Sequence, residues 1–217
     1  MTERKEPAVF LSGVILAAGA STRMGRPKQL LPLAGRALLK RVLDGAAASR
    51  LDEIVLVLGH RAEEIRAAVE LPSRCPTRVV INPDHGRGQS TSLRLGLRSV
   101  DARAVAAAVL LGDQPWIERE LIDRVAAAFI AADSLAARPV WRDRRGRRIP
   151  GHPVFLARRM WPEVDKLSGD QGARSLLRAR LDVLLEVEVE GEPPGDIDDP
   201  EDYERAVGAL GTVAIRD

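Results

Sequence analysis

The chain has 217 residues, of which 45% are hydrophobic and 29% charged, and its formal net charge is +2; these values predict one globular domain with a sizeable core. Aromatic residues make up only 3% of the chain, too few for the stacking platforms of single-stranded nucleic acid binders, so small anionic ligands are expected and nucleic acid is not. A single cysteine, a charged start without an apolar signal segment, and no stretch long enough to span a membrane favour a cytoplasmic protein without membrane contact.

Short aliphatic segments alternate with longer helical patterns along the first part of the chain. Strands are expected at 14–18, 53–58, 78–81 and 105–111. Helices are expected between and after them, at 38–48, 62–69, 90–100 and 117–132. This alternation predicts a mostly parallel sheet that is covered by helices on both faces.

The alternation changes after Ala136. Two strands, at 138–141 and 154–156, are expected to flank an arginine-rich turn. A helix over 171–180 capped by Asp170, a strand over 183–189 and a last helix over 201–210 are expected to follow. No linker divides the chain, so we expect a single domain over 13–210, preceded by a flexible segment over 1–12.

A run of small residues follows the first expected strand, in the segment VILAAGASTRMGRPKQLL. It is not a P-loop, because Arg and Pro follow its last glycine where that motif has Lys and then Ser or Thr. It also lacks the dinucleotide fingerprint G-x-G-x-x-G, because Gly19 has no glycine two positions later. Small residues let backbone N–H groups approach an anion, and Arg23 and Lys28 add charge, so the segment predicts a phosphate-binding loop.

Asp113 follows the fourth expected strand, in the segment VLLGDQP. Ligands of open α/β sheets bind beyond the carboxyl ends of the strands, so Asp113 is expected to face the glycine loop. An unpaired carboxylate would be costly there, whereas Mg²⁺ takes one or two carboxylates together with phosphate oxygens. We therefore expect Mg²⁺ as the cofactor and nucleotidyl transfer as the chemistry. The alternative role for Asp113 is a helix N-cap.

The glycine loop, LAAGASTRMGRPK, matches the signature L-A-A-G-x-S-x-R-M-G-x-x-K of nucleotidyltransferases with a GT-A-like fold. The chain further resembles the molybdenum cofactor nucleotidyltransferases (MobA-like NTP transferases), and among these the cytidylyltransferase branch. The later segments that carry the likeness are NPDHGRGQSTSLRLGL, LLGDQP, PGHPVFL, GDQGAR and DIDDPEDYERA. The resemblance implies a single-domain, Rossmann-like, three-layer α/β/α fold with a mostly parallel sheet, and a MobA-like domain over 13–210.

The resemblance also implies a role for individual residues of the nucleotide half. The residues implied to bind the nucleotide are Leu16, Ala17, Ala18, Gly19, Arg23, Lys28, Gly88, Ser90 and Ser92. Arg23, Lys28 and Asp113 are implied to be catalytic, and Asp113 is also implied to be the first metal ligand.

The second metal ligand is implied to be Asp198, with Asp196 as the alternative because Asp199 replaces a Thr of related motifs. Asp198 has a second possible role, as the cap of the helix expected near Pro200. The residues expected at the acceptor are Gly151, His152 and Arg174. For His152 a structural hydrogen bond, and for Arg174 a surface ion pair, are the alternative roles.

The activity implied by the resemblance is transfer of CMP from CTP to the terminal phosphate of a molybdopterin-type cofactor, with release of pyrophosphate. The implied partners are CTP or GTP, the molybdopterin cofactor and a molybdenum hydroxylase as client. One alternative is activation of a sugar or alditol phosphate, which the absence of Asn over 138–174 disfavours. The other is a non-catalytic protein that delivers the cofactor, which the retention of Arg23, Lys28 and Asp113 disfavours.

Overall fold

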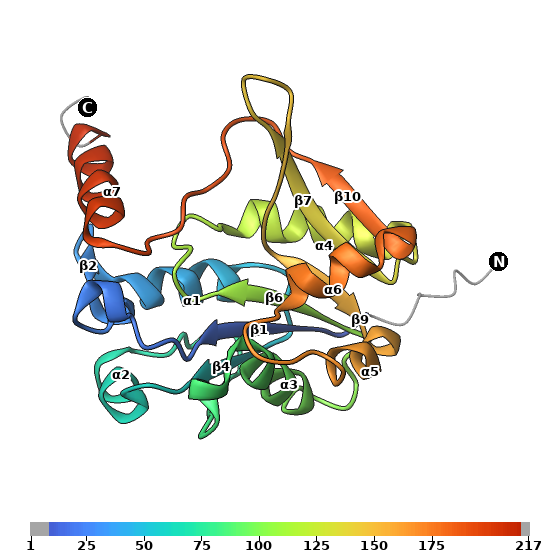
Figure 1. Cartoon of the computed structure of the whole chain (residues 1–217), viewed down its shortest axis with the longest axis horizontal. Helices are drawn as coiled ribbons and strands as arrows, with labels where there is room; N and C mark the ends of the chain where they lie inside the picture. The colour runs from blue at the N-terminus through green and yellow to red at the C-terminus, as the bar shows by residue number, and fades with distance from the viewer. Residues whose placement is uncertain (1–8, 214–217) are drawn as a thin grey trace.

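The computed structural model describes residues 9–213, which form a three-layer α/β/α domain (Figure 1). The central sheet has eight strands in the order β10-β7-β9-β6-β1-β4-β5, with β8 paired to β7 at the side. Their bounds are β1 Leu11–Ala17, β4 Glu53–Leu58, β5 Thr77–Ile81, β6 Ala106–Leu111, β7 Ala136–Arg142, β8 Arg148–Pro150, β9 Val154–Ala157 and β10 Leu184–Glu188. The small strands β2 (Pro32–Leu33) and β3 (Arg36–Ala37) form a separate hairpin.

The sheet is parallel on the side of β6, β1, β4 and β5 and mixed on the other side. Strands β6, β1, β4 and β5 pair in parallel. Strand β9 runs antiparallel to both β6 and β7, and β7 pairs in parallel with β10. This mostly parallel, single-domain architecture confirms the fold class that the sequence predicts.

Helices cover both faces of the sheet. Their bounds are α1 Leu38–Ala48, α2 Ala62–Ala68, α3 Gln89–Arg98, α4 Arg119–Ala131, α5 Trp161–Val164, α6 Ala173–Ala179 and α7 Pro200–Val213. Successive side chains of a strand point to opposite faces, so Leu11 and Ile15 of β1 pack in the core under α1 and α4. Val14 and Leu16 pack instead in the core under α3, α5 and α6. None of the described helices is long and apolar enough to cross a bilayer.

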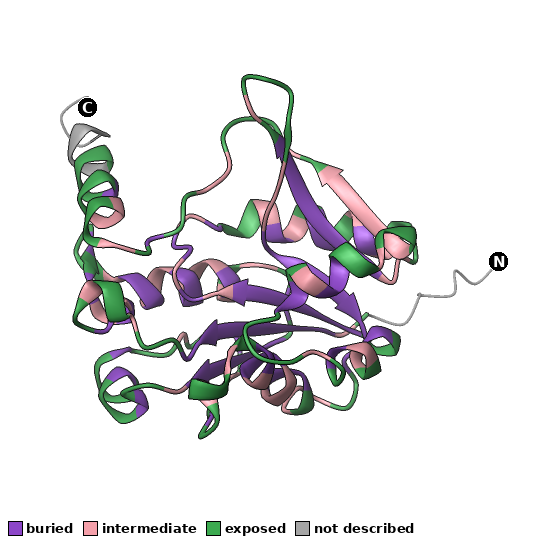
Figure 2. Ribbon diagram, in the orientation of Figure 1, coloured by how far each residue is buried: buried purple, intermediate pink, exposed green. Residues whose placement is uncertain are grey.

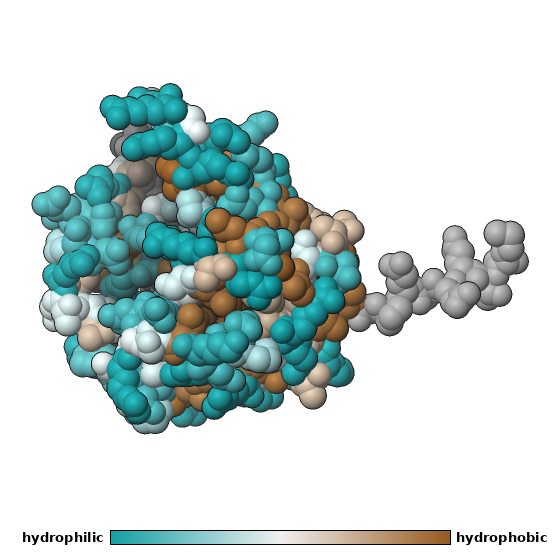
Figure 3. Space-filling view, turned by 45° about the vertical axis from the view of Figure 1, so that its right-hand side comes forward, coloured by the Kyte–Doolittle hydropathy of each residue, from teal (hydrophilic) through white to brown (hydrophobic). Residues whose placement is uncertain are grey.

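The central strands β1, β4, β6, β7 and β9 are largely buried, the edge strand β10 is only partly buried, and the helices expose their outer sides (Figure 2). The hairpin between β7 and β8 projects at the top of the molecule, and hydrophilic residues cover it in Figure 3. Its arginines pair locally, for example Arg147 with Asp143 at 2.6 Å and Arg142 with Glu188 at 2.8 Å. The arginine-rich turn is therefore a solvated hairpin.

Several expected boundaries differ from the structure. β1 begins at Leu11, whose side chain is fully buried. Residues 11 and 12 therefore belong to the sheet and not to the flexible segment expected over 1–12. Residues 1–8 of that segment lie outside the described residues. The last helix runs on from the expected 210 to Val213. Helix α6 begins at Ala173 with Gly172 as N-cap and without a side-chain cap. The expected cap at Asp170 is therefore wrong.

The reason for this late start is contact between two loops. The backbone N–H of Ser90 donates to Gly169 O at 3.1 Å, which draws the loop before α6 toward the start of α3. Gly88, with φ of 104°, allows this approach, because a Cβ there would lie 2.2 Å from the carbonyl carbon of Gly169. Asp170 is thereby carried to the edge of the sheet where β1 and β6 end.

Candidate active site

The loop after β1 makes two short turns that bring Lys28 back beside the strand. The turns are 3-10 helices over Thr22–Met24 and Lys28–Leu30. Ser21 adopts a left-handed conformation with φ of 53°, and its hydroxyl accepts a hydrogen bond from the Lys28 N–H at 3.2 Å. The local fold therefore fixes the distance between the start of the loop and its lysine.

A buried amide holds the start of this loop against the strand. Gln29 is 2% exposed, and its Nε2 donates to Ala17 O at 3.0 Å and to Gly19 O at 3.4 Å. Sequence analysis misses Gln29, because a single Gln before two leucines gives no pattern signal. Its role is to fix the carbonyls of the loop, so that the outward-facing backbone remains for a ligand.

Lys28 lies between the two carboxylates implied to bind metal. Its Nζ donates to Asp113 Oδ2 at 2.7 Å and to Asp198 Oδ1 at 2.9 Å. Burial alone lowers the pKa of Lys28, but attraction to Asp113 and the hydrogen bonds to both carboxylates outweigh it, so the pKa is raised. Lys28 is therefore a fixed positive charge at this point.

Asp113 and Asp198 are the residues that fit a divalent cation. Each offers an oxygen to the same ammonium group, and Asp113 Oδ1 is buried without a hydrogen-bond partner. Among residues 9–213 no group of three or more His, Cys, Asp or Glu could hold a metal. A cation here would therefore rely on two carboxylates together with phosphate oxygens and water, a coordination typical of Mg²⁺.

The alternative roles of these two aspartates do not occur. Helix α4 has Glu118 as its N-cap, so Asp113 does not cap it. At the start of α7, the N–H of Asp202 donates to Asp199 Oδ1 at 2.9 Å, and Asp202 Oδ2 accepts from the N–H of Asp199 at 3.2 Å. Asp199 and Asp202 thus form a reciprocal cap, which leaves the carboxylate of Asp198 to Lys28.

Asp196 lies two residues earlier and has a different partner. Its Oδ1 accepts a hydrogen bond from Gln114 Nε2 at 2.5 Å. Burial raises the pKa of Asp196, and the neighbouring carboxylates of Asp113 and Asp198 raise it further. Among the two candidates for the second metal ligand, Asp198 is the one that shares Lys28 with Asp113.

A cavity of about 560 Å³ lies over the glycine loop. Of the residues implied to bind nucleotide or metal, those that line it are Leu16, Ala17, Ala18, Gly19, Arg23, Lys28, Gly88, Ser92, Asp113 and Asp198. Ser90 does not line it; it is fully buried, and its expected contact with the nucleotide is not supported. The first turn of α3 directs Ser90 inward, whereas Ser92 lies at the cavity. His85, Gln89 and Asp170 also line it; Gln89 lies within the segment 88–92 that the resemblance places at the base and ribose, whereas Asp170 was expected only as a helix cap.

The two cations of this cavity differ in their partners. The Arg23 side chain makes no hydrogen bond or ion pair within the described part of the chain, and it is exposed at the cavity. Lys28 is bound to both carboxylates. Arg23 is thus available for an anion at once, whereas Lys28 has to leave its carboxylates to reach one.

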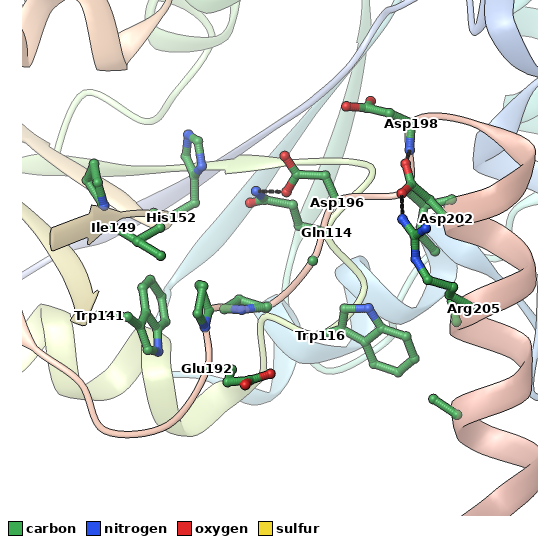
Figure 4. Close-up of a pocket in the computed structure, with 18 of the residues that line it drawn as sticks. Gln114, Trp116, Trp141, Ile149, His152, Glu192, Asp196, Asp198, Asp202 and Arg205 are labelled. Carbon is green, nitrogen blue, oxygen red and sulfur yellow. Dashed lines mark hydrogen bonds and ion pairs between the residues drawn. The ribbon is translucent and has the colours of Figure 1, made fainter. Parts of the chain in front are cut away.

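A second cavity, of about 770 Å³, adjoins the first, and Asp198 lines both. It contains all the residues expected at the acceptor, Gly151, His152 and Arg174, together with Trp116 and Trp141 (Figure 4). A Cβ at Gly151 would lie 2.5 Å from Cζ3 of Trp141, so only glycine permits this close packing. Sequence analysis missed both tryptophans, although Trp116 follows Asp113 closely in the chain.

His152 is a buried neutral group in this second cavity. It is 6% exposed, and its Nδ1 has no hydrogen-bond partner. Burial, together with the nearby charges of Arg174 and Arg138, lowers the pKa of His152 to about 4. The ring is therefore uncharged at neutral pH, and the structural hydrogen bond considered for it is not made by Nδ1.

Comparison with known proteins identifies the family. A family model described as "MobA-like NTP transferase domain" matches residues 13–184. The chain is 32% identical over 211 residues to the purine catabolism protein PucB of Bacillus subtilis (strain 168), covering 93% of this chain and 98% of PucB. It is also 32% identical over 208 residues to nicotine blue oxidoreductase of Paenarthrobacter nicotinovorans, covering 90% of this chain and 95% of that protein.

A solved structure gives the same result. The crystal structure of Rv0371c from Mycobacterium tuberculosis H37Rv matches with a TM-score of 0.80 and 33% identity, over 93% of this chain and 99% of that one. A complex of Rv0371c with manganese matches with a TM-score of 0.76 and 31% identity, over 93% of this chain and 100% of that one. The family model covers most of this chain, and the relatives match it over nearly their whole length. The chain therefore belongs to the family of MobA-like NTP transferases.

Proposed function

We propose that the protein is a cytidylyltransferase that transfers CMP from CTP to the terminal phosphate of a molybdopterin-type cofactor and releases pyrophosphate. The observation that carries this proposal is the junction of the two cavities at Asp198, beside Lys28 and Asp113. A transferase needs its donor phosphate and its acceptor phosphate at one point, and this junction supplies such a point. Asp113 and Asp198 would hold Mg²⁺ there.

The proposed reaction is a displacement at phosphorus. An oxygen of the acceptor phosphate bonds to the α-phosphorus of CTP, while the bond from that phosphorus to the oxygen bridging to the β-phosphate breaks. The departing pyrophosphate keeps the bonding electron pair. Arg23 and Lys28 would neutralise the charge that builds on it, and a bound divalent cation would supply further charge neutralisation.

No general base is needed for this step, because a phosphate oxygen is already ionised at neutral pH. His152 is buried and uncharged, which suits binding of the acceptor rather than proton transfer. Arg174 lines the same cavity and makes no hydrogen bond or ion pair in the described part of the chain. Its guanidinium is suited to a bidentate contact with the acceptor phosphate.

Lys28 has two positions in this proposal. In the structure it neutralises Asp113 and Asp198. When a triphosphate and a cation bind, Lys28 would leave the two carboxylates, which would then hold the cation, and would turn to the phosphates. The lysine thus prevents repulsion between two carboxylates until substrate arrives.

The relatives bear on the proposal in different ways. One relative is named an oxidoreductase and another for purine catabolism, so membership of the family does not by itself decide the reaction. The Rv0371c complex with manganese supports a divalent cation for this chain. We further propose a cytoplasmic location, which the single cysteine and the charged start favour, and a molybdenum hydroxylase client, which the proposed acceptor implies.

The test is pyrophosphate release with CTP, GTP, ATP or UTP, with and without molybdopterin. We expect release only with CTP and molybdopterin together, and none with hexose 1-phosphates. Turnover with a sugar phosphate and none with the pterin would replace the proposal by sugar-phosphate activation. Release with GTP alone among the nucleotides would overturn the choice of CTP. Cofactor binding without any release would indicate a delivery protein.

A further inference from the structure

The second cavity, which holds Gly151, His152 and Arg174 and is called the acceptor cavity below, contains three polar side chains with unused hydrogen-bonding atoms. Gln114 is 4% exposed and His152 6% exposed, and neither Gln114 Oε1 nor His152 Nδ1 has a partner. The third is Asp196, whose Oδ2 makes no hydrogen bond within residues 9–213. A buried polar atom without a partner costs free energy, so this set points to a polar ligand.

The hydrogen bond between Gln114 and Asp196 determines which atoms face the ligand. A carboxylate only accepts hydrogen bonds, so the amide nitrogen of Gln114 has to be the group at Asp196 Oδ1, at 2.5 Å. Gln114 Oε1 and Asp196 Oδ2 are then left as two neighbouring acceptors. A ligand that meets both must present two adjacent donors.

The cavity around these acceptors is shaped for a flat ring. Figure 4 shows His152, Gln114 and Asp196 along one side of the pocket, and Trp141 and Trp116 along the other. Pro193 and Pro194 add apolar lining. Aromatic and proline walls favour a planar heterocycle, which can stack on them while its edge reaches the polar groups.

We propose that Gln114 and Asp196 recognise the edge of a planar heterocycle in which an exocyclic amine and a ring N–H both donate, while His152 contacts the neighbouring ring carbonyl. A 2-amino-4-oxopyrimidine fused to a second ring has this edge. The inference deepens the proposed function, since it assigns the residues that would select the ring of the acceptor rather than its phosphate. It is independent of which nucleotide is the donor.

The test compares binding of pterin-6-carboxylate with binding of lumazine-6-carboxylate by isothermal titration calorimetry. Lumazine has a carbonyl in place of the exocyclic amine, so its carbonyl oxygen would face an acceptor oxygen of the protein and no hydrogen bond could form. We expect the wild-type protein to bind the pterin at least about tenfold more tightly, because an unmet buried hydrogen bond commonly costs that much. Equal binding of the two rings, or binding of neither, would overturn the proposal.

The variant Asp196→Asn replaces one acceptor by an amide that can donate. We expect the preference for the pterin to fall to about threefold or less, with an unchanged melting temperature as evidence of folding. Glu192→Gln is the matched control, since it removes a charge from the exposed rim of the same cavity, and it should keep the full preference. A full preference in Asp196→Asn would contradict the assignment.

Binding and transfer can fail separately. If the protein prefers the pterin ring but releases no pyrophosphate with any nucleotide, the ring site stands and the proposed reaction is wrong. If it transfers CMP to molybdopterin while binding both rings equally, the reaction stands and the ring site is wrong. The two readouts therefore distinguish the two proposals.

Discussion

The nucleotide cavity and the acceptor cavity share Asp198 but are built differently. The nucleotide cavity is formed largely by one continuous loop, 16–29, together with the ends of two parallel strands. The acceptor cavity is built from several separate segments: the loop after β6, strand β7, the segment 149–152, helix α6, the loop 192–198 and helix α7. Charged side chains line both cavities; the first adds loop backbone, which suits a triphosphate, and the second adds aromatic rings and buried amide and imidazole groups. The comparison teaches that a shared reaction can be served by a backbone-lined half and an aromatic-lined half.

The largest effect is expected at Asp113, one of the two carboxylates that fit the cation in the nucleotide cavity. Asp113→Asn should lower kcat about a hundredfold or more, because it removes half of the protein ligands available to the cation. Steady-state pyrophosphate release measures this. Asp165→Asn, a surface residue paired with Arg98 at 2.8 Å, is the control that should keep full activity. Normal turnover of Asp113→Asn at ordinary Mg²⁺ concentration would refute the metal assignment.

Arg23 and Lys28 should come next. Replacing either by Ala should reduce kcat about tenfold or more and change nucleotide Kd less, because their charges matter most when pyrophosphate departs. Kinetics combined with nucleotide titration separates the two quantities. If either variant changed only KM, that residue would be a ground-state anchor, and its role in the transition state would have to be withdrawn.

Lys28 also gives a test without turnover. Lys28→Met removes the ammonium that competes with a cation for Asp113 and Asp198, so Mn²⁺ should bind about tenfold more tightly in the absence of nucleotide. Electron paramagnetic resonance of free Mn²⁺ measures the affinity. An unchanged Mn²⁺ affinity would show that the lysine does not occupy the cation position.

The smallest effects are expected in the acceptor cavity. His152→Ala should raise the acceptor KM several-fold and leave CTP binding almost unchanged, because His152 lines only the acceptor cavity. A weakened affinity for CTP would show that the two halves are not separate. The pH dependence of the acceptor KM near pH 6.5 should be the same in His152→Ala as in the wild type, since His152 is already neutral there and only the acceptor phosphate itself ionises in that range.

The pH dependence of the free energy of unfolding should also report on His152. The pKa of His152 is about 4 in the folded protein, below the ordinary value of about 6.5 for an unfolded chain. The unfolded state therefore binds more protons between these values, and the free energy of unfolding should fall as the pH drops from about 6.5 to 4. His152→Gln should flatten this dependence in urea titrations, and an identical slope in the variant would contradict the buried neutral state.

The two halves also differ in how far the sequence predicts them. In the nucleotide half, Arg23 and Lys28 lie on one loop, and the rule that ligands bind beyond the carboxyl ends of the strands places Asp113 opposite that loop. Strand Glu53–Leu58 is predicted to the residue. The expected contact of Ser90 with the nucleotide is not supported, because a shift of one position along helix α3 separates the cavity residue Gln89 from the buried Ser90. The acceptor half depends on contacts between distant segments, such as Gln114 with Asp196, which no local pattern reveals.

The central claim, that the two cavities serve one transfer, is tested most directly by following the α-phosphate. The protein is incubated with CTP labelled at the α-phosphorus and with molybdopterin, and the products are separated. The account predicts label in the pterin product, in equal amount to the pyrophosphate released, and a strong decrease of both products with Asp198→Asn. Label in free CMP, or pyrophosphate release that does not depend on molybdopterin, would contradict it.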